Sequence, residues 1–215
     1  MHASPRRRAD ARRSRAAILD AAVRLLDDRP DASVENVATA AGVTRQTVYA
    51  HFPSRAHLLA AVLDRVTEEA VAAMDAADLD SGSAADALLR LVEAGSRSAD
   101  RYPRLMHAVG SHPADPRADA ERHAPVTDRL GRVVRRGQTN GEFDAALPAD
   151  WLVAVVVALG HAAAAEEDAG RLSGEEAAEA LRCTLLRALG HRPLRPSSAG
   201  GDRFPGAAEP AGGDH

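Results

Sequence analysis

The sequence predicts an all-α protein, because its composition favours helices and its apolar residues recur at helical spacing. Of its 215 residues, 45% are hydrophobic and 3% aromatic. Alanine, the strongest helix former, occurs 48 times. No segment alternates between apolar and polar residues as a half-buried strand does. We therefore expect one or two small helical domains with a core of Ala, Val and Leu.

Composition and motif content exclude several function classes. Cys183 is the only cysteine, which argues against a disulfide framework or a cysteine-based zinc module. The apolar run Trp151–Ala165 is shorter than the ~18 residues of a membrane span, and the N-terminus lacks a signal-peptide pattern. Phosphate-loop and nucleophile motifs are absent, and the histidines lack metal-ligand spacing. We expect a cytoplasmic protein with no catalytic residue, cofactor, metal or membrane contact.

The charge is distributed unevenly along the chain. The net charge is −4, yet residues 1–60 contain 10 Arg and 6 acidic residues. Six of these arginines lie within the first 15 residues, and the chain contains no Lys. A basic arm on an otherwise acidic protein is typical of a nucleic-acid contact, and the alternative is a solvated tail.

The first half of the chain predicts four helices with recognisable ends. An amphipathic helix runs from Arg12 to Asp28 and stops before Pro30. A short helix, Val34–Ala41, follows the N-cap Ser33, and Gly42 closes it. Its capping box is expected to be incomplete, because Asn36 stands where Glu or Gln is usual.

Two further helices complete this half. Thr44 is the N-cap of a helix of barely two turns, Arg45–Ala50. After Pro53 and the N-cap Ser54, a long helix is predicted from Arg55 to about Ala77. Val34–Ala50 therefore has the layout of a helix-turn-helix, whose second helix is polar outside its apolar anchors and fits a DNA major groove.

The segment from Ser33 to Leu59, SVENVATAAGVTRQTVYAHFPSRAHLL, resembles the DNA-binding signature of the tetracycline-repressor-like (TetR) transcriptional regulators. The likeness rests on the Ala-x-x-Ala-Gly-Val-Thr turn and the Tyr49-x-His51-Phe52 step, and covers about residues 12–63. Arg55 departs from the Lys usual in the family, although either residue neutralises a phosphate. The resemblance implies an N-terminal three-helix helix-turn-helix domain followed by a helical ligand-sensing and dimerisation domain.

The resemblance also implies roles for single residues. Arg45, Gln46 and Thr47 would face base edges, where Arg suits guanine and Gln suits adenine. Phosphate contacts would come from Thr44, Tyr49, His51 and Arg55, and Ser33 joins the candidate DNA-binding residues. Tyr49 packing only in the core, and His51 as a solvated turn residue, are the alternatives.

The second half predicts five further helices. They cover about Ala84–Ser98, Tyr102–Val109, Arg117–Gln138, Ala149–Asp168 and Gly174–Leu189, with a loop at Gly110–Asp119. The segment Trp151–Ala165 is apolar on every side and needs cover all round. We expect a homodimer through helices 149–168 and 174–189, and the alternative is a buried central helix in a monomer.

The large side chains of this half are candidates for an effector cavity. In a chain poor in such side chains they indicate an apolar ligand site, and the alternative is that they only fill a thin core. The candidate ligand-binding residues are Tyr102, Leu105, Met106, His107, Val109, Leu130, Trp151 and Val155.

These inferences predict four regions: a basic disordered arm (1–11), a helix-turn-helix domain (12–60), an effector-binding and dimerisation domain (61–190) and a disordered tail (191–215). We expect a DNA-binding transcriptional repressor that an unknown small molecule releases from a palindromic operator in double-stranded DNA. A ligand-independent dimeric DNA-binding protein is the alternative, and a helical enzyme with an accidental helix-turn-helix is a third.

Overall fold

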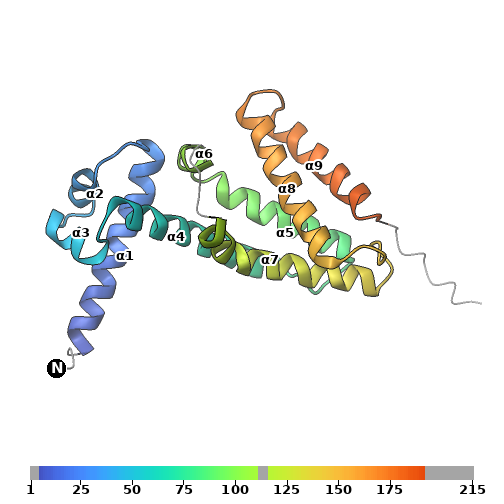
Figure 1. The fold of residues 1–215 in the computed structure, drawn as a ribbon, viewed down its shortest axis with the longest axis horizontal. Coiled ribbons are helices and arrows are strands. Elements are labelled where there is room, and N and C mark those ends of the chain that lie inside the picture. Colours follow the sequence, from blue (N-terminus) through green and yellow to red (C-terminus); the bar gives the residue numbers. More distant parts are fainter. Residues whose placement is uncertain (1–4, 111–115, 192–215) are drawn as a thin grey trace, which may run out of the picture.

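The computed structural model describes residues 5–110 and 116–191, and the fold is that of these two stretches. They form nine α-helices and no strand, which confirms the all-α prediction. The helices are α1 (Pro5–Asp28), α2 (Val34–Ala40), α3 (Arg45–His51), α4 (Arg55–Asp75), α5 (Ala84–Ala99), α6 (Pro103–Gly110), α7 (Pro116–Thr139), α8 (Ala149–Asp168) and α9 (Gly174–Ala188). Figure 1 shows an N-terminal lobe and a C-terminal lobe, with α4 running from one into the other.

The N-terminal lobe is built around a small apolar cluster. Ile18 of α1, Val48 of α3 and Val62 of α4 are each fully buried. The apolar residues of each helix recur at helical spacing, so that one face of the helix packs in the cluster. Because α3 has only seven residues, this packing rather than its own hydrogen bonds must hold it in place.

Helix α1 begins earlier than predicted, so a disordered arm over residues 1–11 is wrong for its described part. Pro5 is the first helical residue, and the helix continues without interruption to Asp28. Proline is well tolerated in a first turn, and the Arg and Ala residues that follow are good helix formers. The basic arm is therefore a helical extension of the N-terminal lobe (Figure 1).

The capping box of α2 is complete, contrary to the prediction. The Asn36 backbone N–H donates to Ser33 Oγ at 3.2 Å, and Asn36 Oδ1 accepts from the Ser33 backbone N–H at 3.0 Å. The shorter amide side chain of Asn36 thus does what Glu or Gln usually does at this position.

Helix α4 belongs to both lobes, so the predicted boundary at residues 60 and 61 falls inside a continuous helix. Leu58, Val62 and Val66 pack in the N-terminal cluster, whereas Met74 packs in the C-terminal one. Two arginines of α7 bind acids of α4. Arg129 contacts Asp75 through two hydrogen bonds of 2.7 and 2.6 Å, and Arg122 contacts Asp64 at 2.9 Å.

The C-terminal lobe contains α5, α7, α8 and α9 around a second apolar cluster. Leu88, Leu91, Val134, Leu152 and Leu185 are among its most buried members. Only one side of α8 enters the cluster. The run Trp151–Ala165 alone was expected to be too short for a membrane span, but the whole of α8 is long and apolar enough to cross a membrane by length and composition. Of its 18-residue apolar window, 17% is buried. Trp151, Ala154, Ala158, Ala162 and Ala165 are exposed, and we call them the open face of α8.

Helix α6 packs against α1 instead of completing the C-terminal core. Leu105 is 2% exposed and belongs to the N-terminal cluster. The carboxylate of Asp27, near the end of α1, accepts hydrogen bonds from the backbone N–H groups of Arg104 and Leu105. An acceptor in this place satisfies free donors of the first turn of α6. Residues 111–115 of the predicted loop and 192–215 of the predicted tail lie outside the described residues, and His191 still joins the fold through a hydrogen bond to the Leu186 carbonyl.

Candidate nucleic-acid interface

Helix α3 presents its first turn to solvent while its other side is anchored. Gly42 takes the positive φ of +66° that the turn after α2 needs, and Thr44 Oγ1 caps α3 by accepting from the Thr47 N–H at 3.1 Å. Val48 and Phe52 are buried and fix the inner side. Arg45 and Gln46 are exposed and Thr47 is half-buried, so the three predicted base-reading residues lie together on one polar turn.

Arg45 is held by two neighbours. Its Nη1 donates to Oε1 of Glu35, in the first turn of α2, and its guanidinium carbon lies 5.3 Å from the centroid of the Tyr49 ring. Tyr49 and, after it, the Glu35 carboxylate raise the pKa of Arg45. Tyr49 is 37% exposed, so part of its side chain is accessible from solvent and does not pack in the core.

The residues predicted to contact phosphates include three that lie outside the first turn of α3. His51 ends α3, with its ring 6.3 Å from that of Phe52. Arg55, in the first turn of α4, donates from Nη2 to the Pro30 carbonyl at 2.8 Å, so it also fastens the loop between α1 and α2. Ser33 is engaged as the cap of α2.

The N-terminal part of α1 adds positive charge to the same lobe. Arg12 and Arg13 are exposed, and Arg13 pairs with Asp10. The Arg15 guanidinium lies over the Phe52 ring, 5.3 Å from its centroid, which ties this basic stretch to the end of α3. The side chains of Arg6, Arg7 and Arg8 lie outside the described ones.

Comparison with known proteins places this geometry in a family. Residues 18–62 match the family model described as "Bacterial regulatory proteins, tetR family". The crystal structure of the TetR-like regulator LfrR from Mycobacterium smegmatis, in complex with proflavine, is 30% identical and matches 85% of this chain and 99% of that chain, with a TM-score of 0.58. This chain belongs to the tetR family.

Two further proteins are similar to this TetR-family chain. The curated transcriptional repressor LfrR of Mycolicibacterium smegmatis is 46% identical over 81 residues, which are 38% of this chain and 43% of LfrR. The sequence match thus spans less than half of that curated relative. The fatty acid degradation regulator FadR from Bacillus halodurans shares the fold, with a TM-score of 0.71 at 17% identity over 89% of this chain and 100% of FadR.

In this TetR-family chain the eight predicted ligand-binding residues do not gather into one site. Tyr102, Leu105 and Met106 pack against the N-terminal cluster, because α6 lies on α1. Tyr102 donates from its hydroxyl to Glu69 at 3.2 Å, and burial followed by the Glu69 charge raises the pKa of Tyr102.

Four of the other five predicted residues are scattered. Leu130 is buried in the C-terminal cluster, and His107 Nδ1 lies 3.6 Å from Asp168. Trp151 is 59% exposed and Val155 half-buried on α8, and the Val109 side chain lies outside the described residues. The predicted single cavity wall is therefore wrong, since its members pack in different parts of the fold.

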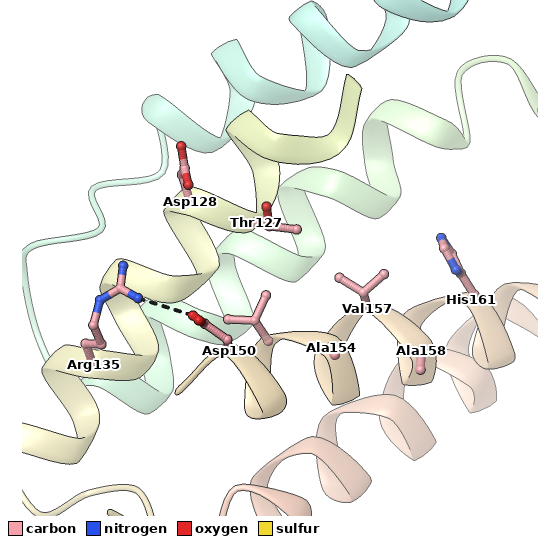
Figure 2. Close-up of a pocket in the computed structure, with 9 residues that line it drawn as sticks. Thr127, Asp128, Arg135, Asp150, Ala154, Val157, Ala158 and His161 are labelled. Atoms are coloured by element: carbon pink, nitrogen blue, oxygen red, sulfur yellow. Dashed lines mark ion pairs between the residues drawn. The ribbon is translucent and has the colours of Figure 1, made fainter. Parts of the chain in front are cut away.

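A cavity of about 500 Å³ lies instead between α7 and α8. Figure 2 shows Ala154, Val157 and Ala158 of α8 along one wall, and Thr127, Asp128 and Arg135 of α7 across from them. Arg135 lies 3.7 Å from Asp150 and offsets that charge, which leaves Asp128 as the remaining carboxylate. The cavity lining is Thr127, Asp128, Arg135, Asp150, Val153, Ala154, Val157, Ala158 and His161.

Sequence reasoning missed this cavity and the contact of Glu35 with Arg45. Helical periodicity assigns residues to faces of α7 and α8 but does not say which faces meet, so it carried no signal for the cavity. A signal for Glu35 was present: it is the only acidic residue between Asp31 and Asp64. Among the described residues, no group of three or more His, Cys, Asp or Glu could hold a metal ion.

Proposed function

We propose that this protein is a homodimeric transcriptional repressor that a small-molecule effector releases from a palindromic DNA operator. The observation that carries the proposal is the polar first turn of α3, exposed at Arg45 and Gln46 and held from behind by buried Val48. A helix presented in this way fits the major groove. Family membership supports the same interpretation, and a protein with this task acts in the cytoplasm, where bacterial DNA lies.

In the proposed complex, Arg45, Gln46 and Thr47 read base edges. The phosphate contacts come from Ser33, Thr44, Tyr49, His51 and Arg55. The helical arginines at the start of α1 add further phosphate contacts. Such contacts position the protein and supply most of the salt-dependent affinity, whereas base contacts determine the sequence.

The dimer is proposed to form through α8 and α9. The open face of α8 begins at Trp151 and continues as a stripe of alanines, of which Ala162 and Ala165 lie outside the lining of the cavity between α7 and α8. Small side chains allow two helices to approach closely, and an apolar face of this length needs cover in water. A two-fold dimer would place two α3 helices on half-sites separated by about one helical turn of DNA or a multiple of it.

The effector is proposed to bind between α7 and α8. The apolar wall at Val153 and Val157 suits an apolar or aromatic body, and Asp128 suits a positively charged or hydrogen-bond-donating end. The related LfrR crystallised in complex with proflavine, a planar aromatic cation, which is the reason to choose that compound as the first probe.

The test begins with selection of bound sequences from a pool of random DNA duplexes. The proposal expects a two-fold symmetric preferred site, and enrichment without symmetry contradicts the dimeric operator. Proflavine is then titrated into the complex while DNA release and Trp151 fluorescence are followed together. The variant Val157→Trp, which fills the cavity, should bind DNA normally and respond less to proflavine. If neither proflavine nor a wider compound library changes DNA affinity, the ligand-independent dimeric DNA-binding protein becomes the better description.

A further inference from the structure

Glu35 and Arg45 form the contact from which this inference starts. Glu35 lies in the first turn of α2 and Arg45 is the first residue of α3, so the ion pair joins the two helices of the helix-turn-helix. The Glu35 and Arg45 side chains are 61% and 58% exposed. Both therefore lie on the surface that α3 turns toward solvent.

An ion pair this exposed contributes little to stability, because water and salt screen it. It also carries an electrostatic disadvantage for DNA binding, since a carboxylate at the DNA-facing surface repels phosphates. The ion pair has a larger effect on the conformational freedom of Arg45 than on stability. A free Arg side chain has many rotamers and reaches phosphates as readily as bases, whereas a guanidinium held at one edge has few.

Arg45 of α3 and Arg55 of α4 are held in different ways. Arg55 donates to the neutral backbone carbonyl of Pro30. Arg45 instead contacts Glu35, the only carboxylate between Asp31 and Asp64, and also lies over the Tyr49 ring. The carboxylate takes up one Nη group of the guanidinium, and the remaining N–H donors are left for another acceptor.

We propose that Glu35 is a positioning residue that holds Arg45 for the O6 and N7 acceptors of a guanine and keeps it from neighbouring phosphates. Glu35 thereby lowers the affinity for DNA in general and raises the preference for one base pair. The inference rests on the proposed function, because it requires α3 to enter the major groove.

The test is a double-mutant cycle of Glu35→Gln and Arg45→Ala in the full-length protein. Base preference at each position is measured by selection from random duplexes, and affinity is measured for the selected site and for unrelated DNA. Arg45→Ala should reduce discrimination at one base pair by about 10-fold or more, the range for removal of a bidentate Arg–guanine pair. Glu35→Gln should remove at least about threefold of that discrimination while binding to unrelated DNA becomes tighter.

The cycle separates the competing explanations. In the Arg45→Ala background, Glu35→Gln should leave base preference unchanged, because there is no guanidinium left to position. A change of preference in that background means that Glu35 reads a base itself, and overturns the inference. Asp31→Asn, which removes an exposed acid in the loop before α2, is the charge-matched control and should strengthen binding to unrelated DNA without altering base preference.

Failure of the inference differs from failure of the proposed function. If Arg45→Ala weakens discrimination and Glu35→Gln does not, Glu35 is only a surface ion-pair partner and the inference is overturned. If Arg45→Ala itself leaves base preference unchanged, α3 does not read DNA through Arg45 and both fall. Circular dichroism melting of each variant identifies any loss of folding.

Discussion

Asp27 and Leu105 are 78 positions apart in the chain, and the Asp27 carboxylate accepts a 3.1 Å hydrogen bond from the Leu105 backbone N–H. The same oxygen accepts from the Arg104 N–H at 3.0 Å, and the Arg104 guanidinium lies 3.7 Å from the Asp28 carboxylate. The last turn of α1 therefore caps the first turn of α6. Movement of α6, which follows α5 of the C-terminal lobe in the chain, must move the end of α1 or break these bonds.

Asp27→Ala should lower the free energy of unfolding by about 1 kcal/mol, the usual cost of losing a helix cap. It should also weaken the effect of a bound effector on DNA affinity, because α6 and α1 then move separately. Denaturant unfolding and effector titration of the DNA complex measure the two effects. Asp27→Asn, which retains an acceptor oxygen, is the matched control and should behave nearly as the native chain. An unchanged effector response in Asp27→Ala shows that coupling runs elsewhere.

Gln46→Ala and Arg55→Gln should affect DNA binding in different ways. Gln46 is exposed on the first turn of α3, so its removal should relax preference at one or two base pairs at a cost of about 1–3 kcal/mol. Arg55→Gln should weaken binding to all sequences alike. It should also lower stability slightly, since Arg55 fastens the loop at Pro30. Competition binding with single-base variants of the selected site distinguishes the two patterns, and interchanged patterns would refute the assignment.

Replacing Arg6, Arg7 and Arg8 by Gln should weaken DNA binding and flatten its salt dependence. Removing one arginine–phosphate interaction lowers the slope of log K against log salt by about 0.9, so the greatest change expected is about 3. Gln preserves helix propensity in this part of α1. The control neutralises three exposed arginines outside α8 and α9, Arg97, Arg101 and Arg117, and should leave the slope as it was. A slope unaffected by the first set would mean that these arginines are a solvated part of the helix.

Stability should fall in acid as the Asp75 carboxylate takes up a proton. The hydrogen bonds from Arg129 lower the pKa of Asp75 below its ordinary 3.8 in the folded chain. A carboxyl group whose pKa is lowered by folding stabilises the fold above its unfolded pKa, and this contribution is lost as the pH falls through the folded pKa. The loss should therefore begin below about pH 4. Asp75→Asn should unfold more easily at neutral pH and show a smaller decline over this acid range, measured by urea unfolding at several pH values. A decline as steep as that of the native chain would show that other carboxyl groups cause it.

Ala162→Arg should convert the proposed dimer into a monomer and weaken DNA binding strongly. Ala162 lies on the open face of α8, where a long charged side chain prevents close approach of a second helix. Sedimentation velocity reports the assembly state, and DNA titration reports the affinity. Ser96→Arg, at an exposed position of α5, is the control and should remain dimeric. A dimer that persists in Ala162→Arg would place the interface on another surface.

Local sequence signals predicted the helix ends well and long-range packing poorly. The caps Ser33, Thr44 and Ser54 determined the starts of α2, α3 and α4, because capping involves neighbours within one turn. The bounds of α8 were predicted as observed. The start of α1 was missed because charge alone was taken as a sign of disorder, although Arg and Ala are good helix formers.

The candidate sites divide in the same way. The base-reading turn was predictable, since Arg45, Gln46 and Thr47 are consecutive and the helix begins at a capped residue. The cavity between α7 and α8 was not, because its lining comes from two helices whose mutual orientation depends on tertiary packing. Leu105 shows the same limit: its apolar side chain marked it as buried, but only the fold shows that it is buried in the N-terminal cluster.

The membership of α4 in both clusters and of α6 in the N-terminal cluster bears on how the protein unfolds. The N-terminal cluster needs Leu58, Val62 and Val66 from the first part of α4, and it is closed by Leu105 from beyond α5. No cut of the chain between residues 61 and 104 leaves that cluster whole on one fragment. The lobes are therefore expected to melt in a single cooperative transition, and a fragment ending at residue 60 is expected to be largely unstructured and susceptible to proteolysis. A fusion protein that uses this regulator therefore needs the whole chain, because its N-terminal lobe is not expected to fold as a separate DNA-binding module.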